Sequence, residues 1–217
     1  MSFSGKVKEE LSRQISTARH CQIAEIAAIL SVCGQVSISA NDHFCVTVHT
    51  ENVSVARKYF TLVEKTFNIE AVIHVRKNVY LKKSNVYRVE VPSHEDTVRI
   101  LQATKFMSPE QEIADDLSVM SRLVIQKECC KRAFLRGTFL AAGSISDPEK
   151  GYHLEIVCSR PLQAQQILEI LTEFEIEGRI VQRKKYYVVY IKEGAGISDF
   201  LNVVEAHVAL MEFENSR

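Results

Sequence analysis

The sequence predicts an α+β fold in which two αββαββα repeats follow an N-terminal helix and are related by a pseudo-twofold axis. The first observation is the order of hydrophobic periodicities, which runs helix, two strands, helix, two strands, helix and then begins again. The second is the spacing of landmarks, since the interval from Gly34 to Gly143 is nearly equal to the interval from Phe67 to Phe174. A tandem structural repeat explains both observations.

In the first half, helices are predicted where apolar residues recur three and four positions apart, and strands where apolar and polar residues alternate. The loop SANDH between the first two strands has the composition of a hairpin turn. The predicted helices are 4–17, 22–34, 53–67 and 94–104, and the predicted strand pairs are 35–39 with 44–50 and 71–77 with 86–91.

The second half repeats this pattern and ends on a long helix. The predicted helices are 129–143, 162–174 and 197–213, and the predicted strand pairs are 144–147 with 152–158 and 178–184 with 186–192. The last helix is still periodic near Arg217, so we expect it to lead toward a further domain outside this chain. The domain division is an N-terminal helix at 1–20, a first repeat at 21–102, a linker with room for a helical turn after Pro109 at 103–127, and a second repeat at 128–217.

Composition narrows the function classes. Lys and Arg total 27 and Asp and Glu total 27, which excludes a globally basic nucleic-acid binder but leaves a local basic face open. No run of 18 apolar residues occurs, so no membrane contact is expected. Six cysteines without a C-x-x-C pair favour reduced thiols in a cytoplasmic protein. The histidines are scattered without H-x-x-x-H or H-E-x-x-H spacing, so we expect no metal site and no cofactor.

Two helices that end in glycine carry a resemblance to a known fold. The segments IAAILSVCG, 26–34, and LRGTFLAAG, 135–143, resemble the motif helices of LAGLIDADG homing endonucleases. The resemblance implies that the two helices pack side by side on the pseudo-twofold axis and that the two sheets straddle DNA. Small side chains would allow a close approach of the helix backbones, although alanines in two unrelated core helices are the alternative. The small residues assigned to this packing are Ala24, Ala28, Gly34, Ala133, Gly137, Ala141 and Gly143.

The whole chain is also similar to the N-terminal part of the WhiA family of bacterial regulators. The opening SFSGKVKEEL and the run CCKRAFLRGTFLAAGSISDPEKGYHLEI carry this resemblance. It implies a DNA-binding transcription regulator of cell division, chromosome segregation or sporulation in Gram-positive bacteria, associated with the nucleoid. It also implies that DNA is bound mainly through a C-terminal helix-turn-helix domain absent from this chain, and that other regulatory proteins are partners.

The catalytic positions of the nuclease fold are degenerate here. Nucleases of this fold place an acid one residue before each helix-ending glycine, where paired carboxylates hold Mg²⁺, which prefers oxygen ligands. Those positions are Cys33 and Ala142. The nearby Asp147 and Glu149 suit turn chemistry better than metal binding. The sequence therefore predicts a protein that is not an enzyme, with an active metal-dependent endonuclease or a pure protein-interaction scaffold as alternatives.

The second hairpin of each repeat is rich in basic residues. Lys and Arg side chains there would contact DNA phosphates, or else they are solvated faces that keep strand edges from pairing with other molecules. Alternation along the strands means that not all of them point the same way. The possible DNA contacts are Arg76, Lys77, Lys82, Lys83 and Arg88 in the first repeat, and Arg179, Arg183, Lys184, Lys185 and Lys192 in the second.

Overall fold

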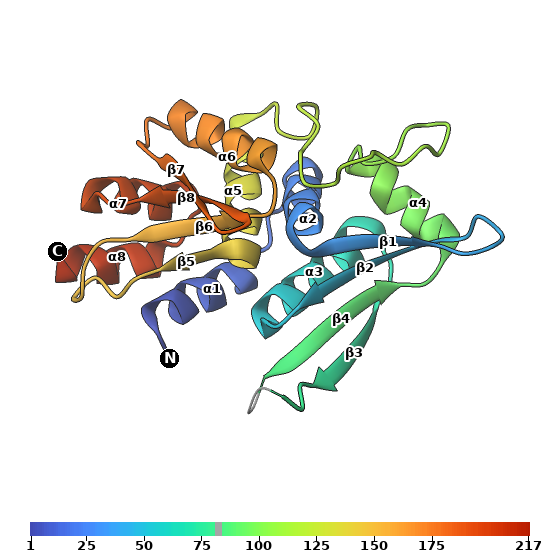
Figure 1. Ribbon diagram of the computed structural model, residues 1–217, viewed down its shortest axis with the longest axis horizontal. Coiled ribbons are helices and arrows are strands. Elements are labelled where there is room, and N and C mark those ends of the chain that lie inside the picture. The colour runs from blue at the N-terminus through green and yellow to red at the C-terminus, as the bar shows by residue number, and fades with distance from the viewer. Residues whose placement is uncertain (81–83) are drawn as a thin grey trace.

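The computed structural model describes residues 1–80 and 84–217, and it contains two similar halves (Figure 1). The predicted α+β tandem repeat is confirmed. The elements of the first half are α1 (Phe3–Arg13), α2 (Arg19–Cys33), β1 (Gly34–Ile38), β2 (Phe44–Thr50), α3 (Val53–Phe67), β3 (Val72–Lys77), β4 (Asn85–Val91) and α4 (His94–Ala103). Those of the second half are α5 (Glu128–Ala142), β5 (Gly143–Ile145), β6 (Leu154–Cys158), α6 (Pro161–Glu173), β7 (Arg179–Arg183), β8 (Tyr186–Ile191), α7 (Gly194–Val203) and α8 (His207–Ser216).

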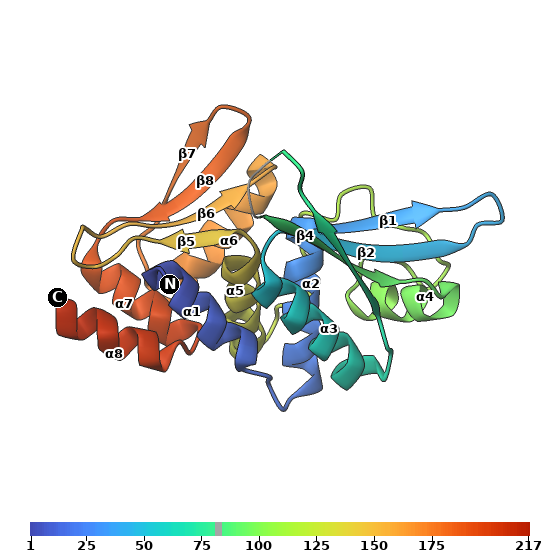
Figure 2. The same ribbon diagram turned by 90° about the horizontal axis from the view of Figure 1, so that it is seen from below.

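Each half folds its four strands into one antiparallel sheet. The strand orders are β1-β2-β4-β3 and β5-β6-β8-β7, so in each half the second hairpin joins the first through its later strand. The helices gather on one side of the two sheets, as Figure 2 shows. Alternate strand residues such as Val89 and Ile191 are buried against these helices. We call the opposite side of the two sheets, which carries the other strand residues, the open face.

The two glycine-ended helices, α2 and α5, pack against each other in the middle of the molecule (Figures 1 and 2). The two helices approach closely at Gly137. A Cβ atom there would lie 2.9 Å from the Cβ of Ala28 and 2.9 Å from the carbonyl oxygen of Glu25. Ala24 and Ala133 are fully buried. Because interaxial distance follows side-chain size, glycine at this point lets the two backbones touch.

Gly34 and Gly143 join each motif helix directly to a strand. Their φ angles are −84° and −90°, so these glycines are not needed for a left-handed conformation. They are needed because a Cβ atom at either position would collide with the preceding turn of the helix. A Cβ on Gly34 would lie 2.6 Å from the carbonyl oxygen of Leu30, and a Cβ on Gly143 would overlap the ring of Phe139. Each helix can therefore turn into its sheet without a loop.

Helix α1 has no counterpart in the second half, and it contacts both halves. Glu10 in α1 accepts hydrogen bonds from the backbone N–H groups of Val208 and Ala209, both at 2.9 Å, and so caps the N-terminus of α8. The ring of Phe3 lies 6.3 Å from that of Phe213. On its other side, α1 packs against α3. The N-terminal helix thus connects the first half to the end of the chain.

One prediction about the elements is wrong. The single helix predicted at 197–213 is two helices, α7 and α8, separated at Glu205, which has a φ of +66°. The N–H of Ala206 bonds to the carbonyl of Leu201 at 2.9 Å, a helix-ending turn formed without glycine. In the linker, the described chain forms turns after Pro109 and no helix before α5 begins. The linker covers the core, since Met120, Val124 and Ile125 are buried.

The Gly137 contact predicts a clear stability effect. Gly137→Ala should lower the free energy of unfolding by about 1–2 kcal/mol, because overpacking against a backbone carbonyl outweighs the roughly 1 kcal/mol that alanine gains in a helix. Gly194→Ala in α7 is the control, since a Cβ there meets its neighbours at 3.4 Å, an ordinary contact distance. Urea unfolding would measure both variants. Equal stabilities for the two would contradict the close packing of α2 and α5.

Candidate functional site

The tips of the two motif helices carry no carboxylate. Cys33 is the last residue of α2 and Ala142 is the last residue of α5. The thiol of Cys33 donates a hydrogen bond to the carbonyl of Ile29 at 3.3 Å. Burial raises the pKa of this thiol to about 12, so it stays protonated at neutral pH. A protonated thiol and a methyl group offer nothing to Mg²⁺, which binds oxygen ligands.

The acids nearest to these tips in sequence belong to turns. A carboxylate oxygen of Asp147 accepts a hydrogen bond from the backbone N–H of Glu149 at 3.1 Å, which fixes the β5–β6 turn. Asp42 occupies the corresponding β1–β2 turn with a φ of +52°. The placement of Asp147 and Glu149 therefore agrees with the turn chemistry expected from the sequence.

Four of the predicted basic residues lie on the open face. Strand register places Arg76 opposite Val86, and Arg88 follows Val86 on the same side of β4, away from buried Val89. In the second sheet, Arg179 lies opposite Tyr190 and Arg183 lies opposite Tyr186. These tyrosines alternate with buried Val189 and Ile191, so the two arginines also point away from the helices.

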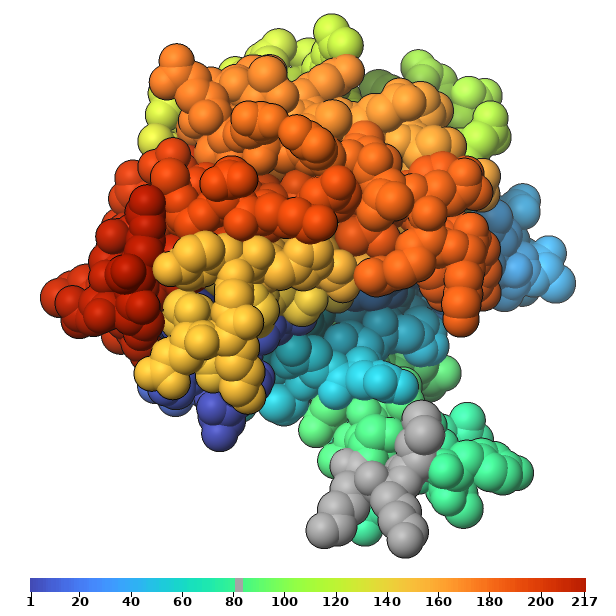
Figure 3. Space-filling view, turned by 60° about the vertical axis from the view of Figure 1, so that its left-hand side comes forward, coloured from blue at the N-terminus to red at the C-terminus, as the bar shows by residue number. Residues whose placement is uncertain are grey.

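The six lysines of the predicted set are placed differently. Lys77 is paired with Asn85 and lies on the side of the sheet that carries Val89 and Val91. Lys184 and Lys185 form the β7–β8 turn, where Lys184 has a φ of +57°. Lys192 follows β8, with its ammonium 5.3 Å from the ring centre of Tyr190. Lys82 and Lys83 lie outside the described residues. The β3–β4 hairpin that leads toward them projects from the body of the protein (Figure 3).

Acidic side chains sit among the arginines of the open face. Arg88 pairs with Glu90 at 3.1 Å, and Arg183 pairs with Glu155 at 3.2 Å. Arg179 pairs with Glu177 at 3.5 Å. These ion pairs were not anticipated from the sequence. Arg88–Glu90 and Arg179–Glu177 join residues two positions apart along the chain, whereas Arg183–Glu155 joins residues on different strands. They reduce the positive potential that ten basic residues would otherwise create.

Glu155 occupies the centre of one such group. It accepts hydrogen bonds from His153 at 2.9 Å and from Arg183 at 3.2 Å. Partial burial works to raise the pKa of this carboxyl group, but the hydrogen bonds and charges of His153 and Arg183 together hold it below its usual value. Glu155 is therefore ionised at neutral pH. Its carboxylate binds the guanidinium of Arg183 and so competes with any DNA phosphate for that group.

A buried charged cluster that was not predicted from the sequence lies beside the α2–α5 contact. The Nζ atom of Lys58 lies 2.9 Å from Oε1 of Glu25, and both side chains are fully buried. The guanidinium of Arg136 lies 4.0 Å from Oε2 of Glu25 and 3.1 Å from Glu205. The signals in the sequence were single charges within apolar runs, Glu25 in IAEIAAIL and Arg136 in AFLRGTFLAA. We call Glu25, Lys58 and Arg136 the axial charge cluster.

The charges of this cluster depend on one another. Burial raises the pKa of Glu25 and lowers the pKa of Lys58, while the opposite charges of the partners counteract both shifts. Lys58 also donates hydrogen bonds to the carbonyl groups of Leu11 and Gln14 at the end of α1. Neither carboxylate oxygen of Glu25 accepts a hydrogen bond of ordinary geometry, so its attraction to the cations is mainly Coulombic.

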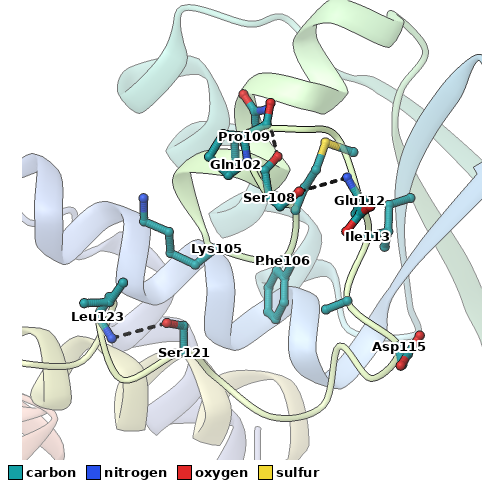
Figure 4. A pocket seen from close by; sticks show the side chains of 12 residues that line it. Gln102, Lys105, Phe106, Ser108, Pro109, Glu112, Ile113, Asp115, Ser121 and Leu123 are labelled. Atoms are coloured by element: carbon teal, nitrogen blue, oxygen red, sulfur yellow. Dashed lines mark hydrogen bonds between the residues drawn. The ribbon is translucent and has the colours of Figure 1, made fainter.

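A hollow of about 910 Å³ lies between α4 and the linker. The side chain of Gln102 donates a hydrogen bond to the carbonyl of Ser108 at 3.1 Å and braces one wall. Figure 4 shows Lys105 and Asp115 on different sides of the hollow. Polar groups do not converge on one point there, as a small-molecule site would require.

The architecture corresponds to solved structures of nucleases. The crystal structure of I-DmoI in complex with DNA and Mn matches with a TM-score of 0.61 at 12% identity, covering 86% of this chain and 97% of that chain. At this identity the likeness shows the fold alone. Paired motif helices, two four-stranded sheets and tips without acids define the class as a LAGLIDADG homing-endonuclease-like protein that lacks the acidic residues of the motif.

Family comparisons then give a narrower assignment. Residues 19–107 match the WhiA N-terminal LAGLIDADG-like domain, and residues 131–217 match the WhiA LAGLIDADG-like domain. A curated relative from Lachnoclostridium phytofermentans, named probable cell division protein WhiA, is 52% identical over 217 residues and is covered by this chain to 69% of its length. The chain belongs to the WhiA family.

A solved member of this family shares the whole architecture. The crystal structure of full-length DUF199/WhiA from Thermatoga maritima matches with a TM-score of 0.75 at 21% identity. The match covers 100% of this chain and 66% of that chain, so this chain spans about two thirds of the length of the solved protein. None of the helices in the described residues is both long enough and apolar enough to cross a bilayer.

The axial charge cluster predicts non-additive stability effects. Lys58→Met and Glu25→Leu should each lower the free energy of unfolding by about 3–5 kcal/mol, because each leaves a buried charge without its main partner. The double variant should lose at least about 2 kcal/mol less than the sum of the two, since it leaves neither charge stranded. Urea unfolding of the four proteins in a double-mutant cycle measures this coupling, and additive losses would show that the pair is not coupled.

Proposed function

We propose that this chain is the catalytically inactive, DNA-facing scaffold of a transcription regulator of cell division. The observation that carries the proposal is the absence of a carboxylate at the two motif-helix tips, where Cys33 has a thiol and Ala142 has no ligand atom. Strand cleavage in this fold needs a hard metal ion between two phosphates. The curated relatives named as cell division proteins support the regulatory role.

The open face is the surface that we assign to DNA. Arg76, Arg88, Arg179 and Arg183 point away from the helices on both sheets, where they can reach phosphate oxygens. The I-DmoI structure, which contains DNA, has the same fold and therefore the same kind of face. Because acidic partners neutralise three of these arginines, binding by this chain alone should be weak and steeply dependent on salt.

Specific DNA recognition is assigned to a helix-turn-helix domain that the family resemblance implies outside this chain. In this arrangement the scaffold orients that domain and adds phosphate contacts of its own. Regulation would then concern cell division, chromosome segregation or sporulation, and the protein would act in the cytoplasm at the nucleoid. Other regulatory proteins are expected partners. They could bind those parts of the open face that do not contact DNA.

The absence of catalysis is tested with purified protein and supercoiled plasmid. We expect no nicking or linearisation in Mg²⁺ or Mn²⁺, because the tips offer no carboxylate. Agarose electrophoresis over several hours would reveal any cleavage. Magnesium-dependent nicking that vanishes in Asp147→Asn or Glu149→Gln would overturn the proposal, since these acids would then replace the missing ligands.

The DNA-facing role predicts a gain of binding when Glu155 is neutralised. Glu155→Gln should free Arg183 and tighten binding to a random duplex about 3- to 10-fold at low salt, with the salt slope steeper by roughly 0.9 for each added phosphate contact. Fluorescence anisotropy titrations at several salt concentrations measure both quantities.

The matched control is Glu173→Gln, which removes the same charge from helix α6, where Glu173 pairs with Lys131. It should change the affinity less than twofold. Equal effects of the two variants would show that net charge, and not the open face, governs binding. A chain that fails to retard DNA at low salt, even in the Glu155→Gln variant, would instead favour a pure protein-interaction scaffold.

A further inference from the structure

Four potential metal ligands meet where the two motif helices begin, at the opposite end from Cys33 and Ala142. His20 and Cys21 lie in the first turn of α2, and Cys129 and Cys130 lie in the first turn of α5. One imidazole nitrogen and three sulfur atoms all lie within 4.8 Å of one another. The Sγ atom of Cys129 is 3.3 Å from Nε2 of His20.

The pseudo-twofold axis relates the four residues in pairs. The interval along the chain from His20 to Cys129 equals the interval from Cys21 to Cys130. The same interval relates Gly34 to Gly143. The two residues at the start of α2, His20 and Cys21, therefore lie beside the equivalent two residues at the start of α5, Cys129 and Cys130. The cluster follows from the tandem architecture, which places two ligands from each half around one point.

The donor set matches the chemistry of zinc. Zinc is bound tetrahedrally by Cys and His, with Zn–S distances of about 2.3 Å and Zn–N distances of about 2.0–2.1 Å, which put neighbouring ligand atoms roughly 3.5–3.8 Å apart. A spread of 4.8 Å needs only small side-chain movements to reach this geometry. Thiolate ligands exclude Mg²⁺ and Ca²⁺. An iron–sulfur cluster would need more room between its cysteines than these atoms leave.

The surroundings of the four ligand atoms shield a metal ion on one side and let it enter from the other. Cys21 and Cys130 are buried, whereas His20 and Cys129 are exposed, so the point is shielded on one side and reachable on the other. A cavity of about 170 Å³, lined by His20 and Cys130, adjoins it and gives a metal ion access.

We propose that His20, Cys21, Cys129 and Cys130 form a structural zinc site that fastens the start of α2 to the start of α5. No single segment of the sequence has the ligand spacing of a zinc site, so the sequence predicted no metal. Two ligands from each of two segments satisfy no such pattern. The site closes the end of the α2–α5 pair that lies away from the sheets, and it is independent of DNA binding and of catalysis.

The test begins with the whole chain purified under reducing conditions and loaded with Zn²⁺. Elemental analysis and native mass spectrometry should find one zinc per chain, and zinc should raise the thermal unfolding midpoint. Replacement by Co²⁺ should give the visible bands of a tetrahedral site together with sulfur-to-cobalt charge transfer. Cys129→Ser, at an exposed ligand, should bind zinc more than tenfold more weakly.

Two further variants separate ligation from general damage. Cys45→Ser removes a thiol from strand β2, outside the cluster, and should keep full zinc binding. His20→Cys gives both halves the same pair of ligands, and it should keep zinc while shifting the cobalt bands toward those of a four-sulfur site. The second variant keeps the proposal testable even if Cys129→Ser folds poorly.

Three results would overturn the proposal. The first is a reduced wild-type chain that takes up no stoichiometric zinc. The second is equal zinc affinity in the wild type, Cys129→Ser and Cys45→Ser. The third is an unchanged cobalt spectrum in His20→Cys, which would place the metal elsewhere.

Discussion

Direct contact between the backbones of α2 and α5 is the constraint on which the rest of the structure depends. At Gly137 the helices approach so closely that a single methyl group would meet both Ala28 and a carbonyl oxygen. Each helix runs without a loop into its own sheet through Gly34 or Gly143. The relative position of the two sheets is therefore fixed by the helix pair, and so is the shape of the face that they present.

The axial charge cluster ties the asymmetric parts of the chain to this symmetric pair. Lys58 binds the last carbonyls of α1, and Arg136 reaches Glu205 at the turn between α7 and α8. Both cations also face Glu25 on α2. Buried charges cost solvation free energy unless they are paired, so each segment is held in the one place where its partner is available.

The sequence was sufficient for the fold because its periodicities are strong and occur twice. The features that could not be predicted from the sequence have physical causes. The break at Glu205 uses a left-handed glutamate where glycine would have given a signal. The pairing of Arg183 with Glu155 joins residues on different strands. Which hairpin residues face solvent followed from register, which could be known only once the strand order was known. The absence of acids at Cys33 and Ala142 could be predicted because the motif fixes the catalytic position as the residue before each helix-ending glycine.

The pairing of α2 with α5 also constrains how the protein is made. The two helices lie in different halves of the chain, so at a synthesis rate of about 5–20 residues per second the nascent α2 waits roughly 5–20 s for its partner. During that interval its strip of small residues is open to any similar helix, including the α2 of a neighbouring nascent chain. Contacts this distant in sequence also slow folding. If α2 instead pairs with the α5 of a neighbouring chain, and the reverse pairing follows, the product is a domain-swapped dimer.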